Sequence, residues 1–228
     1  MDEEGVPPGD LRAGARALRT PRAAGVAGIL FALLLGSAMV LLRVSTPAES
    51  SDAGTWLTDP HRRASFTVAM GLVPFAGIAF LWFMGVVRDH IGEKEDRFIA
   101  TVFMGSGLLF VAMLFVGAAV AGALAASFTR GPGNFLQEDA LNLQRSITHQ
   151  LLNVFALRMA AVFVISTTTI AFRTGILPKW LGISGYVVAL ILLVSSGNIP
   201  WVNLVFPLWT LALSIHILLA APRRVAQR

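Results

Sequence analysis

The chain contains no cysteine among its 228 residues. This absence excludes disulfide bonds, thiolate metal sites and a cysteine nucleophile. Charge is scarce as well, because Asp, Glu, Lys and Arg make up 14% of the residues, whereas soluble domains carry about 25%. Hydrophobic residues make up 55%, and so few charges could not keep that much apolar surface in water. The composition therefore excludes a soluble globule and a disordered chain, and it predicts an all-α polytopic membrane helix bundle.

Acidic residues are missing from every long apolar stretch of the chain. Proton-coupled transporters usually carry a carboxylate or a histidine relay inside the membrane, so this absence argues against that class. The net charge of +5 comes from basic residues beside the apolar stretches, where they set topology, and no nucleic-acid binding is expected. Arginine outnumbers lysine by 16 to 2, which suggests a GC-rich bacterial genome.

Six apolar segments predict six transmembrane helices. They cover about 23–42, 64–87, 98–127, 147–172, 180–196 and 201–221. The first segment is too long for the apolar region of a secretory signal peptide, which holds about 7–15 residues. Residues 45–63 and 88–97 are predicted as loops. We expect one six-helix domain over 23–222, with a flexible cytoplasmic tail at 1–22 and a short one at 223–228.

The basic residues also predict an orientation. With the N-terminus in the cytoplasm, the inner segments carry 12 basic residues and the outer loops carry 5. Because positive loops face the cytoplasm, this bias predicts an N-in, C-in topology with an even number of spans. The expected location is a bacterial cytoplasmic (inner) membrane, which the chain would cross several times.

Two patterns predict how the middle helices pack. Gly117, Ala118, Ala121 and Gly122 are small residues about one helical turn apart, which favours close helix packing over a flexible hinge. The second pattern is an amphipathic stretch that Asn134 can cap and that runs without Gly or Pro into the fourth apolar segment. It predicts one helix from Asn134 to Phe172, about 58 Å long, whose first part packs on the protein's own outer loops or on a partner helix.

The segment Arg173-Thr174-Gly175-Ile176-Leu177-Pro178-Lys179-Trp180-Leu181-Gly182 joins the fourth and fifth spans. It resembles an inner turn found in a bacterial, actinobacterial-type family of multi-helix integral membrane proteins of unknown function. In that turn a basic residue, an apolar residue and Pro are followed by Trp-Leu-Gly at the start of a transmembrane helix. The resemblance covers the last quarter of the chain and implies a fold type without a known activity.

Ser106 and His216 are the residues that an intramembrane enzyme could use, because they lie on separate predicted spans. A serine and a histidine in such places are similar to the pair of rhomboid-type serine proteases. The chain lacks the motifs that surround that pair, and Ser106 stands between Gly105 and Gly107. A helix-packing role for Ser106 is therefore the simpler interpretation, and the enzyme stays an alternative.

The remaining titratable groups give no strong cofactor or metal motif. His61 and His149 lie on the predicted outer side, and His90 and His216 lie on the inner side. Two haems, each held by a pair of histidines near one face of the membrane, would need such a distribution. Because His61 and His90 lie in polar loops, we expect no cofactor. Two acidic groups offer metal ligands, and solvated loops explain both more simply. They are Asp89, His90, Glu93, Glu95 and Asp96 inside, and Asp52, Asp59, His61, Glu138, Asp139 and His149 outside.

Arg158 is the one formal charge well inside a predicted span. One interpretation is that its side chain reaches outward to headgroups or to Glu138 or Asp139. The other is an outward-facing polar ligand-binding pocket that takes a carboxylate or phosphate group. That pocket would draw on polar residues at similar depth, namely Asn153, Ser195, Ser196, Asn198 and Asn203. The hydroxyls of Ser166, Thr167, Thr168 and Thr169 bond their own helix or line a polar path.

These patterns favour a structural or accessory membrane protein that binds membrane lipids or a partner, which would be another membrane protein or a second copy of this chain. A small-solute or lipid facilitator with a pocket around Arg158 is the first alternative. An intramembrane enzyme that uses Ser106 and His216 is the second.

The topology can be tested directly. A reporter fused after Arg228 should be cytoplasmic, and a tag inserted near Asp52 should be accessible from outside intact cells, because the loop charges place these positions on opposite sides. Accessibility to a membrane-impermeant reagent is the measurement. Protection of the Asp52 tag until lysis would reverse the orientation.

Overall fold

The computed structural model describes residues 21–45, 59–91, 97–127, 136–175, 178–195 and 201–220. Its elements are α2 (Pro21–Ser45), α3 (Pro60–Ile91), α4 (Arg97–Ser127), α5 (Leu136–Gln150), the π-helical turn η4 (Leu151–Phe155), α6 (Ala156–Thr174), α7 (Lys179–Val194), the 3-10 turn η5 (Val202–Leu204) and α8 (Val205–Ala220). Every element in this part of the chain is helical, which confirms the all-α fold class. The predicted tails before residue 21 and after residue 220 lie outside the described residues.

Five helical segments are long and apolar enough to cross a membrane, as in a multi-pass membrane protein. They are α2, α3, α4, the continuous α5–η4–α6 segment and η5–α8. The sixth predicted span corresponds to α7, an apolar helix of 16 residues. At about 1.5 Å per residue it is about 24 Å long, shorter than a bilayer core of about 30 Å. The predicted bundle of six apolar helices is therefore present, with one short member.

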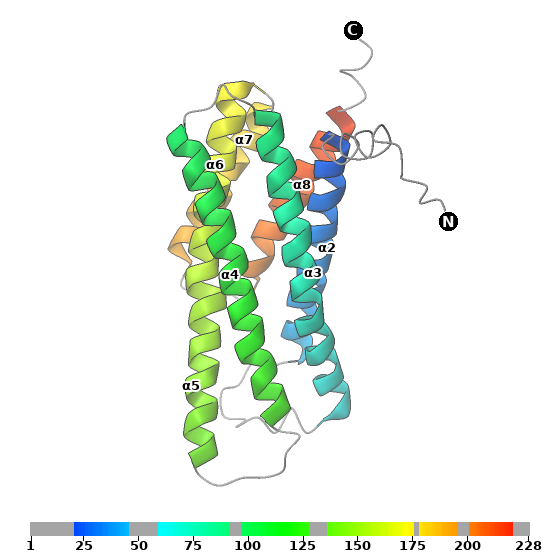
Figure 1. Ribbon diagram of the computed structural model, residues 1–228, viewed down its shortest axis with the longest axis vertical. Helices are drawn as coiled ribbons and strands as arrows, with labels where there is room; N and C mark the ends of the chain where they lie inside the picture. Colours follow the sequence, from blue (N-terminus) through cyan, green and yellow to red (C-terminus); the bar gives the residue numbers. More distant parts are fainter. Residues whose placement is uncertain are drawn as a thin grey trace, which may run out of the picture.

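The helices form an antiparallel bundle in which the first and last are neighbours (Figure 1). The start of α2 lies beside the end of α8, where a Cβ atom added to Gly25 would lie 2.5 Å from Leu218 Cγ. Around the bundle α2 packs on α3, α3 on α4, α4 on α6 and α6 on α7. The described chain thus begins and ends at one end of the bundle, as an even number of crossings requires.

Phenylalanine rings from five different helices fill the middle of the bundle. They are Phe31 of α2, Phe80 of α3, Phe110 of α4, Phe163 of α6 and Phe206 of α8, and each is 3% exposed or less. Ring centroids lie 4.7 Å apart for Phe31 and Phe80, 4.9 Å for Phe80 and Phe163, and 5.0 Å for Phe110 and Phe206. These are the separations and tilted geometries that aromatic pairs prefer. This set of rings, the phenylalanine plug, closes the axis of the bundle.

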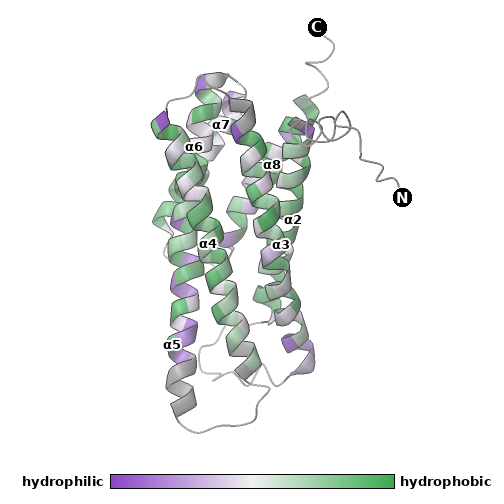
Figure 2. Cartoon of the chain, in the orientation of Figure 1, coloured by the Kyte–Doolittle hydropathy of each residue, from purple (hydrophilic) through white to green (hydrophobic). Residues whose placement is uncertain are grey.

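The outer surface of the bundle is apolar along most of its length. Figure 2 shows hydrophobic colouring over the bundled helices and hydrophilic colouring gathered on α5 and near helix ends. On α7, Ile183, Leu190 and Val194 are each at least 60% exposed. Such a surface is costly in water and favourable in hydrocarbon, so the outside of the bundle matches a lipid environment.

The predicted long fourth helix is confirmed. Helical structure continues from Leu136 through η4 to Thr174, about 58 Å at 1.5 Å per residue. The first part, α5, runs beside α4, and Gln144 Nε2 donates a hydrogen bond to the Val120 carbonyl oxygen. The packing partner is thus a transmembrane helix of the same chain. Asn134, the expected cap, lies outside the described residues.

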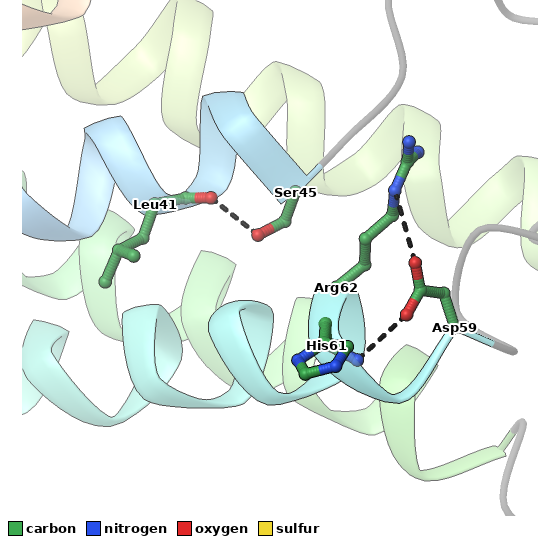
Figure 3. A network of polar contacts seen from close by, with 5 residues as sticks. All are labelled: Leu41, Ser45, Asp59, His61 and Arg62. Atoms are coloured by element: carbon green, nitrogen blue, oxygen red, sulfur yellow. Dashed lines mark hydrogen bonds and ion pairs between the residues drawn. The ribbon is translucent and has the colours of Figure 1, made fainter.

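The boundaries of α3 differ from the prediction. The helix begins at Pro60 and ends at Ile91, so the expected loops at 45–63 and 88–97 are too long. Figure 3 shows the reason at the first end, where Asp59 Oδ1 accepts a hydrogen bond of 2.9 Å from the His61 backbone N–H. A capping aspartate followed by proline at the first helical position is a favourable helix start.

The turn between α6 and α7 has the features that its sequence suggests. Gly175 ends α6 with φ 65°, a left-handed conformation that suits glycine. Pro178 precedes α7, and Trp180 is 64% exposed on its first turn. A Cβ atom on Gly182 would lie 2.4 Å from the Phe172 ring, so the start of α7 and this ring are in close contact.

The plug predicts a difference between two phenylalanines of α3. Phe80→Ala should destabilise the protein by about 3–5 kcal/mol, because it leaves a cavity among packed rings. Phe75→Ala is the matched control, since Phe75 is 62% exposed on the same helix, and it should cost well under half as much. Reversible unfolding in mixed micelles measures both, and equal losses would contradict the role of the plug.

Candidate functional site

The predicted polar residues of the fourth helix lie around a π-helical turn. Asn153 belongs to η4, in which the Ala156 backbone N–H donates to the Leu151 carbonyl oxygen five residues earlier. A π turn inserts an extra residue into the helix and changes which residues face a neighbour, and such turns are frequent at functional sites. Its sequence has no Gly or Pro to signal it, so sequence reasoning missed this feature.

Asn153 and Asn203, two residues of the predicted pocket, are in direct contact. Asn203 Nδ2 donates to Asn153 Oδ1 at 2.6 Å, which joins η5 to η4. Asn203 Oδ1 is buried without a hydrogen-bond partner, and so is the hydroxyl of Ser195, a residue 5% exposed. Asn198 and Ser196, the other residues expected here, lie outside the described residues.

The Arg158 side chain forms a hydrogen bond with the backbone of its own helix. Its Nη1 donates to the Val154 carbonyl oxygen at 3.1 Å, four residues towards the helix start. The side chain therefore runs in the direction that the predicted topology calls outward, as snorkelling arginines do. Among the described residues, no hydrogen bond joins Arg158 to Asn153 or Asn203. The geometry favours the snorkelling interpretation of Arg158.

The hydroxyl-rich stretch of α6 is largely satisfied within its own helix. Ser166, Thr167 and Thr169 donate to the carbonyl four residues earlier, at 2.8 Å in each case. Thr168 differs, because its hydroxyl is buried without a partner. A Cβ atom on Gly185 would lie 2.2 Å from Thr168 Oγ1 and 3.2 Å from Trp209 Cζ2, so both side chains meet at α7. These residues support packing rather than a polar path.

Ser106 and His216 show no catalytic geometry. Ser106 is 5% exposed, and its hydroxyl lies 2.7 Å from the Val102 carbonyl oxygen of its own helix. A Cβ atom on Gly107 would lie 2.3 Å from Met84 Sδ, which is a close approach of α4 to α3. His216 is half-buried on α8, and the described contacts include no hydrogen bond between the two residues. The packing interpretation of Ser106 fits these contacts.

His61 and His149, two of the candidate metal and haem ligands, lie on different helices, α3 and α5. His61 and His149 are exposed at the ends of helices, and the His61 backbone rather than its ring contacts Asp59. Asp52, Glu93, Glu95 and Asp96 lie outside the described residues. Within the described ranges, no three His, Cys, Asp or Glu residues gather as metal ligands do.

A lateral groove lies between the first turns of α3 and the last turns of α4. Its cavity volume is about 590 Å³, within the range of about 300–1,000 Å³ that small-molecule sites occupy. The lining includes Arg63, Phe66, Val68, Met70, Gly122 and Ala126.

The sequence predicted that Gly122 packs against a neighbouring helix. This prediction was wrong, because a Cβ atom there would have no neighbour within 4 Å. Gly117 does pack, since its Cβ would lie 2.5 Å from Leu152.

Comparison of the chain with protein-family models, with curated proteins and with solved structures found no match.

The contact between Asn153 and Asn203 can be measured by a double-mutant cycle. Asn153→Ala and Asn203→Ala should show a coupling of about 1 kcal/mol in unfolding free energy, in the range of interhelical hydrogen bonds in membranes. Asn153→Ala with Ser184→Ala is the control pair, because Ser184 bonds its own helix at Leu181. A coupling no larger than that of the control pair would show that the hydrogen bond contributes nothing.

Proposed function

We propose that this protein is a structural or accessory component of a bacterial cytoplasmic membrane that binds lipid. The observation that carries the proposal is the phenylalanine plug, which closes the bundle axis while the outer surface stays apolar. A protein built in this way meets its ligands at its lateral surface rather than along a central path. The resemblance of the Arg173–Gly182 turn to multi-helix bacterial membrane proteins is in keeping with this assignment.

The distribution of polar groups supports the same proposal. The polar side chains on α6 bond mainly to their own backbone, and Arg158 does so too. A solute path would need such groups to face a common cavity. An enzyme would need a nucleophile within reach of a base, and the hydroxyl of Ser106 is held by its own helix.

A facilitator is the second candidate, and one observation favours it. Asn203 Oδ1 and Ser195 Oγ are buried acceptors without partners where α7 ends and η5 begins, on the half of the bundle that the predicted topology places outside. They could bind a small polar solute from that side. The plug lies between this region and the other end, because Asn203 precedes Phe206 by only three residues.

A flux assay separates the two candidates. Proteoliposomes of the wild-type protein should release encapsulated acetate and inorganic phosphate no faster than protein-free vesicles, because the rings close the axis. These anions are the probes because an arginine site would favour carboxylate and phosphate groups. Saturable release in the wild type that Asn203→Leu or Arg158→Leu abolishes would overturn the proposal and establish the facilitator.

A further inference from the structure

We infer that the lateral groove between α3 and α4 is a binding site for one anionic glycerophospholipid, with an acyl chain along the groove and the phosphate at Arg63. This inference rests on the proposed lipid-binding function and gives it a place and a headgroup class. Three properties of the groove carry it, namely its apolar lining, the depth of Arg63 and the difference between Arg63 and its neighbour Arg62.

The walls of the groove suit a hydrocarbon chain. Phe66 and Met70 come from α3 and Gly122 and Ala126 from α4. Gly122 lines the groove, and a Cβ atom there would meet no neighbour within 4 Å, as is also the case at Gly105 outside the groove. The position beside Gly122 is therefore open space rather than a helix contact, and an apolar occupant of the groove would gain van der Waals contacts there.

The depth of Arg63 matches a phosphate. The uncharged stretch of α3 begins at the next residue, Ala64, and continues to Val87. Arg63 therefore stands at the boundary between headgroups and hydrocarbon, while Met70 lies about 10 Å deeper along the helix. A lipid that enters the groove from the bilayer would place its chain and its phosphate at these two depths without leaving its leaflet.

Arg62 and Arg63 are adjacent but differ in their surroundings. Arg62 Nε lies 3.7 Å from Asp59 Oδ2 (Figure 3), and both side chains are 47% exposed. Arg63 is half-buried and lines the groove, and no ion pair of Arg63 occurs among the described residues. The Arg63 side chain beside the apolar groove is thus available for an anion, and guanidinium groups pair well with phosphate oxygens.

The test is native mass spectrometry of the full chain with added phosphatidylglycerol or phosphatidylcholine. The wild type should retain phosphatidylglycerol in preference. Gly122→Leu should lose one bound lipid, because the new side chain fills the groove. Gly105→Leu is the matched control, since Gly105 lies on the same helix with equally open surroundings outside the groove. Arg63→Gln should weaken phosphatidylglycerol binding by about fivefold, and Arg62→Gln should leave it within twofold.

The other possible results of this experiment each contradict a different part of the inference or the proposed function itself. If the wild type retains no lipid, the proposed function itself fails. If Gly122→Leu retains as much lipid as Gly105→Leu, lipid binds elsewhere and only the groove is wrong. If Gly122→Leu loses thermal stability without any change in lipid binding, a segment of this chain occupies the groove. Equal binding of the two lipids to wild type and Arg63→Gln would reject the phosphate at Arg63.

Discussion

The contact on which the bundle depends is the meeting of five phenylalanine rings from α2, α3, α4, α6 and α8. In lipid no hydrophobic force drives helices together, so association depends on packing and on a few hydrogen bonds. Rings at separations of 4.7 to 6.3 Å supply that packing at one level. Glycines then let the backbones approach around it, as Gly28 does where a Cβ would lie 2.0 Å from Ser214 Oγ.

Polar groups lie on both sides of the plug but do not connect through it. Asn153 and Asn203 bond to each other towards one end, and Thr168 and Trp209 meet at Gly185 towards the other. The unpartnered buried atoms in these two regions are Asn203 Oδ1 and Ser195 Oγ in the first and Thr168 Oγ1 and Trp209 Nε1 in the second. In a low-dielectric interior, a buried polar group without a partner costs free energy and stays local unless water or a ligand reaches it. The two polar regions are therefore separate, one on each side of the phenylalanine plug.

Much of the fold could be predicted from the sequence, because its signals are strong where charge and glycine interrupt apolar runs. The absence of Gly and Pro from Leu136 to Thr174 predicted one long helix, and the structure contains it. The plug could not be predicted, because a helix in lipid is apolar on its inner and outer faces alike, so periodicity does not show which phenylalanines turn inward. Phe80 and Phe75 look the same in sequence, yet one is buried and the other exposed.

The candidate site shows the same limit and adds a second one. Counting residues along the helices placed Asn153 and Asn203 at a similar depth, and the two side chains are in contact in the structure. Depth does not give direction around a helix, which is why Arg158 could be placed in the same pocket although it bonds to Val154. The π turn changes that direction within one turn of helix. Arg63 was counted only as a loop charge, because its importance depends on the space beside Gly122, a feature of the packed bundle. A closed axis and an open flank together favour a protein that works through its lateral surface.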